Sequence, residues 1–344
     1  MRLLVTGGAG FIGTNFARSA LTRPDVERLV VVDALTYAGN FENLADLASH
    51  AAFRFVRHDI ADSAAMSALV AEEGIDVLVN FAAESHVDRS ITDLGPFLRT
   101  NVHGTLALLQ AVRDRTGFQR FLQVSTDEVY GSVASGRATE QYPTHTSSPY
   151  AASKAAADGF VQAFAITHGV PAVITRCSNN YGPYQFPEKL LPLFITNALD
   201  NEALPLYGDG MNVRDWIHVE DHCAAIWHVL SLPHTDGRVF NVSAHNEIAN
   251  REITDRVLRL TGRPENLVRY VADRPGHDRR YALDASTLRA TGWAPRWTFD
   301  DGIAATADWY SRQRPWWERV KSGAYRDYYE QNYAQRLAPS GVSS

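Results

Sequence analysis

A glycine-rich segment near the start of the chain constrains the fold more than any other feature. The segment TGGAGFIG at residues 6–13 follows an apolar run at residues 3–5 and precedes a helical pattern. Its glycines Gly7, Gly10 and Gly13 have the spacing GxxGxxG. Such glycines allow a tight turn and a close approach of the backbone to a pyrophosphate, and the helix start offers N–H groups and a favourable dipole. We therefore expect a strand–turn–helix unit that binds a dinucleotide.

Apolar runs and helical patterns alternate through the first half of the chain. Short apolar runs predict buried strands at residues 3–5, 29–32, 53–56, 77–81, 121–124 and 172–175. The stretches between them predict helices at residues 12–21, 64–73, 102–113 and 150–167. This alternation predicts an α/β fold, a Rossmann-type doubly wound parallel sheet with helices on both faces.

The second half of the chain has a different texture, with prolines at positions 183, 187, 192 and 205. Patterns there predict helices at residues 218–232 and 252–261 and a strand at 239–242 that returns to the main sheet. We expect a dinucleotide-binding domain at residues 1–180, with returning segments near 215–245. A smaller interleaved α/β domain at 181–330 and a tail at 331–344 would complete the chain, with residues 338–344 frayed.

The composition excludes several other classes of protein. The net charge of -6 gives no general attraction to nucleic acid or to a membrane surface. The two cysteines, Cys177 and Cys223, lie far apart, so a disulfide framework is not expected, and they cannot form a zinc site alone. The apolar start is too short for a signal peptide or a membrane span. We therefore expect a cytoplasmic protein with no metal.

An acidic residue at the end of the second predicted strand indicates which dinucleotide binds. Asp33 lies twenty residues after Gly13, where a carboxylate accepts hydrogen bonds from ribose hydroxyls and repels a 2′-phosphate. NAD is therefore favoured over NADP. Further candidates stand at the carboxyl ends of later strands, namely Asp59, Ile60, Phe81, Ala82, Ala83 and Thr100. Asp59 either meets the adenine or is a loop carboxylate, and Thr100 either contacts the cofactor or caps a helix.

Tyr150 and Lys154 lie one helical turn apart on the same face of a predicted helix. A free tyrosine has a pKa of about 10. A nearby ammonium and an oxidised nicotinamide both favour the phenolate, so Tyr150 can act as a general base. Lys154 can also hold the nicotinamide ribose. The alternative is a surface pair, which is less expected in a dinucleotide fold.

The segment STDEVYG at residues 125–131 ends the fifth predicted strand at the same sheet edge. Thr126 can hydrogen-bond the oxygen that is oxidised. Asp127 and Glu128 are two further acid/base groups beside the expected nicotinamide, although such carboxylates elsewhere are usually solvated loop residues. A simple dehydrogenase has no obvious use for them, whereas an enzyme that also eliminates water does.

Segments over nearly the whole chain resemble the extended short-chain dehydrogenase/reductase superfamily and, within it, the dTDP-glucose 4,6-dehydratases. The matching segments are TGGAGFIG at 6–13, VVDALTYAGN at 31–40, FAAESHVDRSI at 81–91, STDEVYG at 125–131, YAASK at 150–154, RCSNNYGPYQFPEKL at 176–190, YGDGMNVRDWIHVEDHC at 207–223 and DRPGHDRRYALD at 273–284. The glycine and YxxxK motifs mark only the superfamily. The Thr-Asp-Glu triplet and the DRPGHDRRY segment are more specific.

The resemblance implies a reaction in four steps on dTDP-glucose. Tyr150, helped by Thr126, removes the proton of the 4-hydroxyl while C4 gives hydride to NAD. Glu128 takes the C5 proton that the 4-ketone acidifies, and Asp127 gives a proton to the departing 6-hydroxyl. NADH then returns its hydride to C6, and C5 is reprotonated, which yields dTDP-4-keto-6-deoxyglucose. One carboxyl must start protonated and its neighbour ionised.

The resemblance also implies further binding residues. Those for NAD, beyond the ones above, are Phe11, Ile12, Ala34, Leu35, Thr36, Ser85, Tyr150, Lys154 and Asn180. Those for the sugar nucleotide are Ser85, Thr126, Asn179, Lys189, Leu190, Pro205, Tyr207, Arg214, Asn250, Arg274 and His277. Arginine forks suit the diphosphate oxygens, but Arg214 could instead form an ion pair with Asp215. The turn at residues 241–244 departs from the glycine-rich sequence expected there, and residues 132–146 form a shorter segment than in some relatives.

Three rival functions stay open on the sequence alone. A sugar-nucleotide 4-epimerase would share the fold and YxxxK but would have small residues in place of Asp127 and Glu128. A dehydratase for UDP- or GDP-hexose can keep the triplet and differs only in the base pocket. A non-catalytic NAD-sensing or scaffold protein predicts a degraded tyrosine–lysine pair, which is intact here.

The helices predicted at residues 102–112 and 150–165 carry small and apolar residues over wide faces. Two such helices from each of two chains can form a four-helix bundle across a two-fold axis, and the relatives are commonly homodimers. We therefore expect a homodimer, with ordinary packing against the sheet as the alternative.

Overall fold

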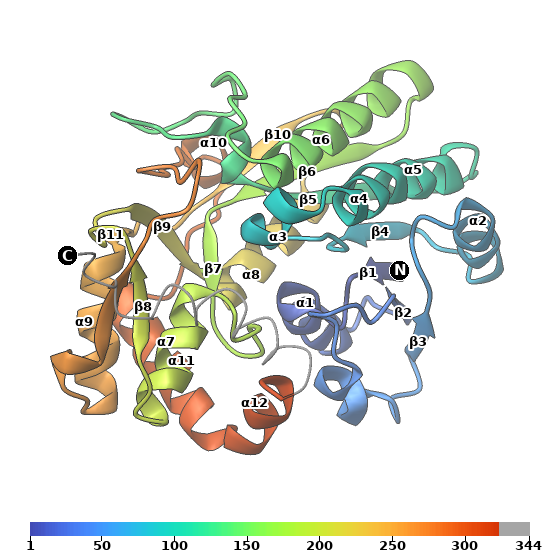
Figure 1. The fold of residues 1–344 in the computed structure, drawn as a ribbon. Coiled ribbons are helices and arrows are strands. Elements are labelled where there is room, and N and C mark those ends of the chain that lie inside the picture. Colours follow the sequence, from blue (N-terminus) through green and yellow to red (C-terminus); the bar gives the residue numbers. More distant parts are fainter. Residues whose placement is uncertain (323–344) are drawn as a thin grey trace.

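The computed structural model describes residues 1–322, and its centre is a sheet of seven strands that all run parallel (Figure 1). The strand order is β10-β6-β5-β4-β1-β2-β3. The strands are β1 (Arg2–Thr6), β2 (Arg28–Asp33), β3 (Phe53–Arg57), β4 (Val77–Asn80), β5 (Arg120–Thr126), β6 (Ala172–Cys177) and β10 (Val239–Val242). This arrangement is the predicted doubly wound sheet, and β10 returns to it beside β6 as expected.

Apolar side chains alternate between two cores, one on each face of the main sheet. Residues of β1 show this: Leu3 and Val5 face one core, and Leu4 faces the other. The helices of the first face are α1 (Phe11–Leu21) and α8 (Val219–Ser231), and those of the second face are α2 (Ser63–Glu72), α5 (Thr105–Arg113) and α6 (Pro149–His168). The inner strands β1 and β2 are buried on both sides and have nearly continuous apolar sequences, whereas the edge strand β3 is only partly buried.

The predicted helix at residues 102–113 differs most from the structure in this half. A π-helical turn, η2 (Leu98–Gly104), comes first, and the regular helix α5 begins only at Thr105. Gly104 packs against Ile60, where a Cβ atom would lie 2.5 Å from the Ile60 side chain. The other predicted strands and helices are present with bounds that differ by at most two residues.

The second half of the chain builds smaller sheets around a third core. Their orders are β11-β9-β7 and β12-β8. The strands are β7 (Asn179–Tyr181), β8 (Leu204–Tyr207), β9 (Val213–His218), β11 (Glu247–Ala249) and β12 (Val268–Val271). The helices around this core are α7 (Leu190–Leu199), α9 (Asn250–Thr261), α11 (Phe299–Arg312) and α12 (Arg314–Val320). Among the elements around this third core, the sequence patterns predicted only α9. The strands were not predicted because they are short and follow prolines or turns.

The remaining elements are short. They are η1 (Phe41–Leu47), α3 (Val87–Thr92), α4 (Gly95–Phe97), η3 (Asp127–Tyr130), η4 (Glu265–Leu267) and α10 (Ser286–Arg289). Cys177 and Cys223 are buried free thiols. Within residues 1–322, no helix has both the length and the apolarity that crossing a bilayer requires. The predicted tail at 331–344, including the frayed residues 338–344, lies outside the described residues.

The order of the strands fixes where a ligand binds. The chain moves outward from β1 to β2 and β3, and then restarts on the other side of β1 with β4, β5 and β6. Ligands of open parallel sheets bind beyond the carboxyl ends of the strands at this switch point. The glycine segment follows β1, and the Thr-Asp-Glu triplet ends β5, so both lie at this edge.

Candidate active site

The glycine segment leaves no room for side chains, as a dinucleotide loop requires. Gly7 has φ +67°, and a Cβ atom on it would lie 2.6 Å from the backbone nitrogen of Ala82. A Cβ on Gly13 would collide with the Gly7 carbonyl. Helix α1 begins at Phe11 without a side-chain cap, so its first N–H groups are available to a ligand. The loop therefore fits a pyrophosphate.

Asp33 closes the far side of this loop. Its carboxylate accepts hydrogen bonds from the backbone N–H groups of Ala9, at 2.9 Å, and Leu35, at 2.8 Å. Burial raises the pKa of Asp33, and these N–H groups oppose that rise. The side chain is thus held rigidly at the wall of the cavity, where a ribose would meet it.

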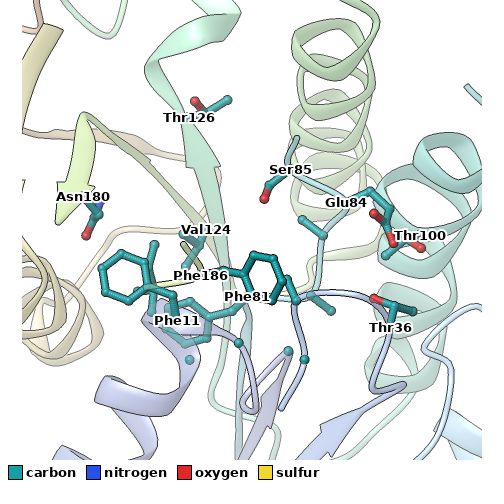
Figure 2. A pocket seen from close by; sticks show the side chains of 18 of the residues that line it. Phe11, Thr36, Phe81, Glu84, Ser85, Thr100, Val124, Thr126, Asn180 and Phe186 are labelled. Carbon is teal, nitrogen blue, oxygen red and sulfur yellow. The ribbon is translucent and has the colours of Figure 1, made fainter. Parts of the chain in front are cut away.

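A cavity of about 310 Å³ runs from the glycine loop to the end of β5. Figure 2 shows the rings of Phe11, Phe81 and Phe186 in its middle, with Thr36 on one side and Asn180 on the other. The predicted cofactor residues that line it are Gly7, Gly10, Phe11, Ile12, Gly13, Asp33, Ala34, Thr36, Asp59, Ile60, Phe81, Ala82, Ala83, Ser85, Thr100, Tyr150, Lys154 and Asn180. Leu35 contributes through its bond to Asp33.

A second cavity of about 180 Å³ adjoins the first. Glu128, Asn179, Glu188 and Lys189 line both of them, so the two spaces meet at the end of β5. The predicted substrate residues that line the second cavity are Asn179, Lys189, Leu190, Pro205, Tyr207, Arg214, Asn250, Arg274 and His277. Ser85 and Thr126 lie in the first cavity instead.

The Thr-Asp-Glu triplet lies where the two cavities meet. Thr126 caps the short helix η3: its hydroxyl accepts from the Glu128 N–H and donates to Asp127 Oδ1, both at 3.2 Å. Asp127 Oδ2 is buried and has no hydrogen-bond partner among the described residues. A buried, unpartnered carboxyl oxygen beside a cavity is a candidate proton donor to a ligand.

Charge separates the two carboxyl groups. Burial raises the pKa of Asp127 far above its usual range, and the nearby Glu128 and Asp215 carboxylates add to the rise. Burial also raises the pKa of Glu128, but the cationic Arg274, Lys189 and Arg214 oppose that rise. Asp127 is therefore the more readily protonated of the pair, and Glu128 is the more readily ionised.

Tyr150 and Lys154 face this cluster from helix α6. The helix starts at Ser148, whose hydroxyl accepts from the Ala151 N–H at 3.1 Å, and Pro149 occupies its first turn. Lys154 Nζ donates to the Val124 carbonyl at 2.6 Å, which places the ammonium under the end of β5.

The chain by itself does not lower the pKa of Tyr150. Burial raises it well above the usual range, the Glu128 carboxylate adds to the rise, and only a hydrogen bond with Thr126 opposes it. Burial also lowers the pKa of Lys154. The chain alone therefore does not produce a phenolate near neutral pH, because Tyr150 is buried beside anions.

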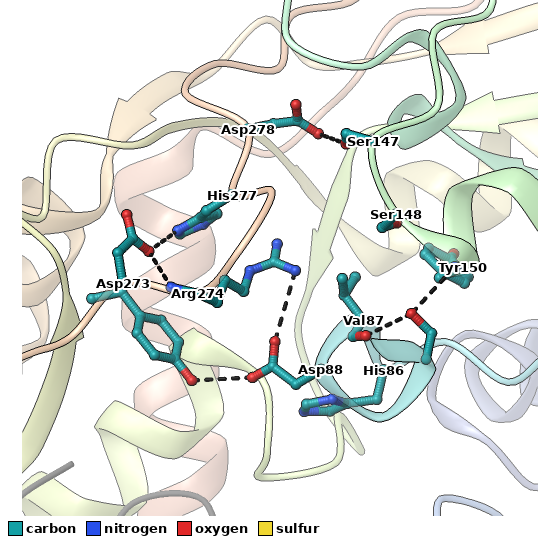
Figure 3. A network of polar contacts seen from close by, with 12 residues as sticks. His86, Val87, Asp88, Ser147, Ser148, Tyr150, Asp273, Arg274, His277 and Asp278 are labelled. Atoms are coloured by element: carbon teal, nitrogen blue, oxygen red, sulfur yellow. Dashed lines mark hydrogen bonds and ion pairs between the residues drawn. The ribbon is translucent and has the colours of Figure 1, made fainter. Parts of the chain in front are cut away.

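Polar side chains from three distant segments meet around the second cavity (Figure 3). Asp88 of α3 accepts from the Tyr207 hydroxyl at 3.1 Å and lies 3.7 Å from Arg274. His277 contacts Asp273, which also accepts from the Arg274 N–H at 2.8 Å. Burial and the nearby Arg274 and Arg214 lower the pKa of His277 to about 4, so its ring is neutral at pH 7.

Arg214 does not pair with Asp215, which resolves one alternative from the sequence. Neighbouring residues of a strand face opposite sides. Asp215 accepts from the Ser243 hydroxyl and the Asn246 N–H, whereas Arg214 lies 4.2 Å over the Tyr281 ring and lines the second cavity. Ser243 thus explains the sequence at residues 241–244: its hydroxyl anchors Asp215.

Several residues that line the two cavities were not predicted from the sequence. The first cavity also has Tyr37, Glu84, Gln185, Phe186 and Glu188 in its wall, and the second has His86, Asp88, Trp216 and Tyr281. Glu188 is the most informative, because burial raises its pKa to about 7. Its position in the segment RCSNNYGPYQFPEKL, directly before Lys189, was the available signal.

The chain matches the family model described as GDP-mannose 4,6 dehydratase over residues 4–306. A dTDP-glucose 4,6-dehydratase of Xanthomonas campestris pv. campestris is 52% identical to this chain, over 94% of the chain and 97% of that protein.

Solved structures are similar as well. DesIV, a dTDP-glucose 4,6-dehydratase from Streptomyces venezuelae solved with NAD and dTDP bound, is 49% identical, with a TM-score of 0.90 over 93% of this chain and 100% of that one. A UDP-glucose 4-epimerase of Thermotoga maritima has a TM-score of 0.85 at 26% identity, over 91% and 100% of the two chains. The fold is thus shared with epimerases, whereas the sequence is much closer to the dehydratases.

Proposed function

The chain belongs to the dTDP-glucose 4,6-dehydratase family, and we propose that it removes water from dTDP-glucose to give dTDP-4-keto-6-deoxyglucose with bound NAD. The observation that carries the proposal is the pair Asp127 and Glu128 where the two cavities meet, of which Asp127 is the more readily protonated. A 4-epimerase needs neither carboxyl group.

Residues of the first cavity would hold NAD. The glycine loop and the start of α1 would hold its pyrophosphate, Asp33 the adenosine ribose and Lys154 the nicotinamide ribose. The chemistry that NAD would supply there is the uptake of hydride from C4 and its return to C6, and the positive charge of the oxidised ring would favour the Tyr150 phenolate.

The oxidation step uses Tyr150 and Thr126. Tyr150 accepts the proton of the sugar 4-hydroxyl, and the Thr126 hydroxyl, which hydrogen-bonds Tyr150, orients that oxygen. Lys154 stabilises the phenolate through its charge.

The elimination step uses the two carboxyl groups in different protonation states. The 4-ketone acidifies the C5 hydrogen, and Glu128, kept more ionised by Arg274 and Lys189, removes it. Asp127, kept protonated by burial and neighbouring anions, gives its proton to the 6-hydroxyl, which leaves as water. Glu128 then returns a proton to C5.

The second cavity would hold the nucleotide. Arg214 and Arg274 supply guanidinium groups for the diphosphate oxygens. Asn179 and Asn250 each carry a buried amide oxygen without a partner among the described residues, and both face this cavity. Such unpartnered polar atoms support a polar ligand here.

The separation of the third core from the two cores of the main sheet supports the proposed domains. Residues 1–180, with returning segments near 215–245, would form the NAD-binding domain around the two cores of the main sheet. Residues 181–330 would mainly form the sugar-nucleotide domain around the third core. We further propose a cytoplasmic location, which the composition supports.

We propose that the molecule is a homodimer. One face of α6 exposes the small or apolar residues Ala152, Ala156, Gly159, Phe160 and Ala163, spaced as on a helix-pairing surface. The neighbouring elements α3 and η2 add the exposed Ile91 and Leu98. Light scattering on the purified protein tests this proposal.

The function is tested with dTDP-glucose, UDP-glucose and GDP-mannose as separate substrates, and mass spectrometry measures the masses of the products. We expect loss of water from the dTDP-sugar. Dehydration of only a UDP- or GDP-sugar would mean that the pocket binds a base other than thymine. Inversion at C4 without water loss would indicate an epimerase. No product from any sugar would reject the proposal.

A further inference from the structure

Helix α6 carries a third buried titratable residue in line with the tyrosine and lysine. Tyr150, Lys154 and Asp158 are spaced four residues apart, so they follow one another on the same face of the helix. All three are buried. The proposed reaction uses the first two, whereas Asp158 has no role in it so far.

Asp158 is held by a buried ion pair with the main sheet. Its Oδ2 accepts from Arg176 Nε of β6 at 2.9 Å, and the two side chains are only 2% and 6% exposed. The Arg176 guanidinium lies 4.9 Å over the Tyr130 ring, whose hydroxyl donates to Asn241 at 2.9 Å. Asp158 is thereby fixed in place and has little freedom to turn away.

Asp158 lies one helical turn after Lys154 on α6 and is the anion whose charge acts most on the Lys154 ammonium. Burial lowers the pKa of Lys154, and the negative charge of Asp158 is the largest effect that opposes the fall. The bond from Lys154 to the Val124 carbonyl adds no charge. Cys177 of β6 also faces Lys154, but burial raises its pKa to about 12, so the thiol stays neutral.

The ion pair with Arg176 keeps Asp158 in the form that Lys154 needs. Burial raises the pKa of Asp158, whereas Arg176 and Lys154 oppose the rise. Lys154, Asp158 and Arg176 together carry one net positive charge, so Asp158 stabilises the ammonium without cancelling the positive charge on this side of Tyr150. The Glu128 carboxylate, in contrast, raises the pKa of Tyr150.

We propose that Asp158 is a positioning residue that acts through Lys154: held by Arg176, it keeps the buried lysine charged and in place behind Tyr150. The role in catalysis rests on the function proposed above. The alternative is a buried ion pair that only stabilises the fold. The two differ in what happens when both charges of the pair are removed together.

The chain offers a direct measurement, because it contains only three lysines, Lys154, Lys189 and Lys321. Lysine labelled with carbon-13 at Cε gives one NMR signal for each, and Lys189→Arg and Lys321→Arg assign them. The pH titration of the Lys154 signal reports its pKa without cofactor or turnover. In Asp158→Asn we expect this pKa to fall by about one unit, because the opposing anion is lost.

The single variant leaves Arg176 buried and unpaired, which threatens the fold. The double variant Asp158→Asn/Arg176→Met removes both charges and is expected to fold. We expect it to keep the lowered pKa of Lys154, because the anion is still missing. If the ion pair only stabilises the fold, Lys154 in the double variant should instead titrate with its wild-type pKa.

Turnover provides the second reading. Activity that needs the Lys154 ammonium is lost as pH rises through its pKa, so the alkaline limb of kcat should move about one unit toward lower pH in both variants. The matched control is Asp236→Asn, which removes the partner of Arg120 from a surface pair of 2.6 Å. We expect neither the titration nor the alkaline limb to move in this control.

The outcomes separate the inference from the function on which it rests. If the wild-type protein dehydrates none of the sugars, the proposed function fails, and the titration still decides whether Asp158 supports the charge of Lys154. If the wild type is active but Lys154 keeps its wild-type pKa in the double variant, Asp158 has no positioning role. A pKa change without a change in the pH profile would likewise exclude a role in the reaction.

Discussion

The two cavities that meet at Glu128 are built in different ways. The cavity at the main sheet has glycines and small residues in its wall beside the glycine loop, from the turn after β1 to Ala82 and Ala83 after β4. The wall of the other cavity carries charged side chains, such as Asp88, Arg214 and Arg274, from α3, β9 and the loop after β12, beside apolar side chains of α7.

The difference has a physical origin. A pyrophosphate bound to N–H groups at a helix start needs close approach, so the first cavity depends on the absence of Cβ atoms. A diphosphate bound by guanidinium groups needs positive charge in the cavity wall. One arginine that supplies this charge, Arg274, contacts the carboxylate of Asp88. The first site should therefore respond to added volume, and the second to changed charge geometry.

The largest effect should come from added volume in the first cavity. Gly7 and Gly136 both have φ +67°, but a Cβ on Gly7 meets the Ala82 nitrogen at 2.6 Å, whereas a Cβ on Gly136 meets nothing within 4 Å. Gly7→Ala should lower NAD affinity by roughly 10³-fold, about 4 kcal/mol, because the loop must shift. Cofactor content after purification and calorimetric NAD titration measure it.

Gly136→Ala is the matched control, since both variants share the strain of a positive φ in alanine, about 1 kcal/mol. It should lose some stability but keep its NAD. Equal NAD loss in the two variants would contradict a backbone-built cofactor site.

The next effect concerns the boundary between the cavities. Glu128→Gln should slow elimination by about 10²–10⁴-fold, because the amide cannot accept the C5 proton. Oxidation at C4 should survive, so the absorbance of reduced nicotinamide should rise after substrate is added and persist. Tyr150→Phe is the comparison, because it should block oxidation itself and leave that absorbance unchanged. A normal overall rate in Glu128→Gln would remove this residue from the mechanism.

The same contrast explains what the sequence could predict. Gly7, Asp33 and the Tyr150–Lys154 pair are set by local spacing within single strand–helix units, so their positions at one sheet edge follow from a parallel sheet. Asp88, Glu188 and Tyr281 come together only through the packing of segments far apart in the chain. The high pKa of Tyr150 in the chain alone could not be predicted for the same reason, since burial beside Glu128 is a property of the assembled site.

A pH effect on stability should come from Glu188, which lines both cavities. Burial raises its pKa from 4.5 to about 7, so the folded state holds this proton more tightly than the unfolded state. The folded state is therefore favoured below pH 4.5, and this contribution is lost as pH rises to about 7. The loss is about 3 kcal/mol at 1.36 kcal/mol for each pKa unit.

Glu188→Gln should remove that fall in stability, which urea unfolding at a series of pH values measures. The exposed Glu27 provides the control, since Glu27→Gln should keep the wild-type slope between pH 4.5 and 7. An unchanged slope in Glu188→Gln would mean that the Glu188 carboxyl titrates normally in the folded protein.

The smallest effect should come from changed charge geometry in the second cavity. Arg274→Lys keeps the positive charge but loses the planar fork, so KM for the sugar nucleotide should rise about tenfold, equal to about 1.4 kcal/mol. NAD content should stay normal, because Arg274 lies outside the first cavity. The nearby Arg279 pairs with Asp209 at the surface at 2.8 Å, so Arg279→Lys changes the same chemistry without reaching the cavity and should leave KM unchanged. If Arg274→Lys lost NAD as Gly7→Ala does, the two cavities would not be the separate sites that their walls indicate.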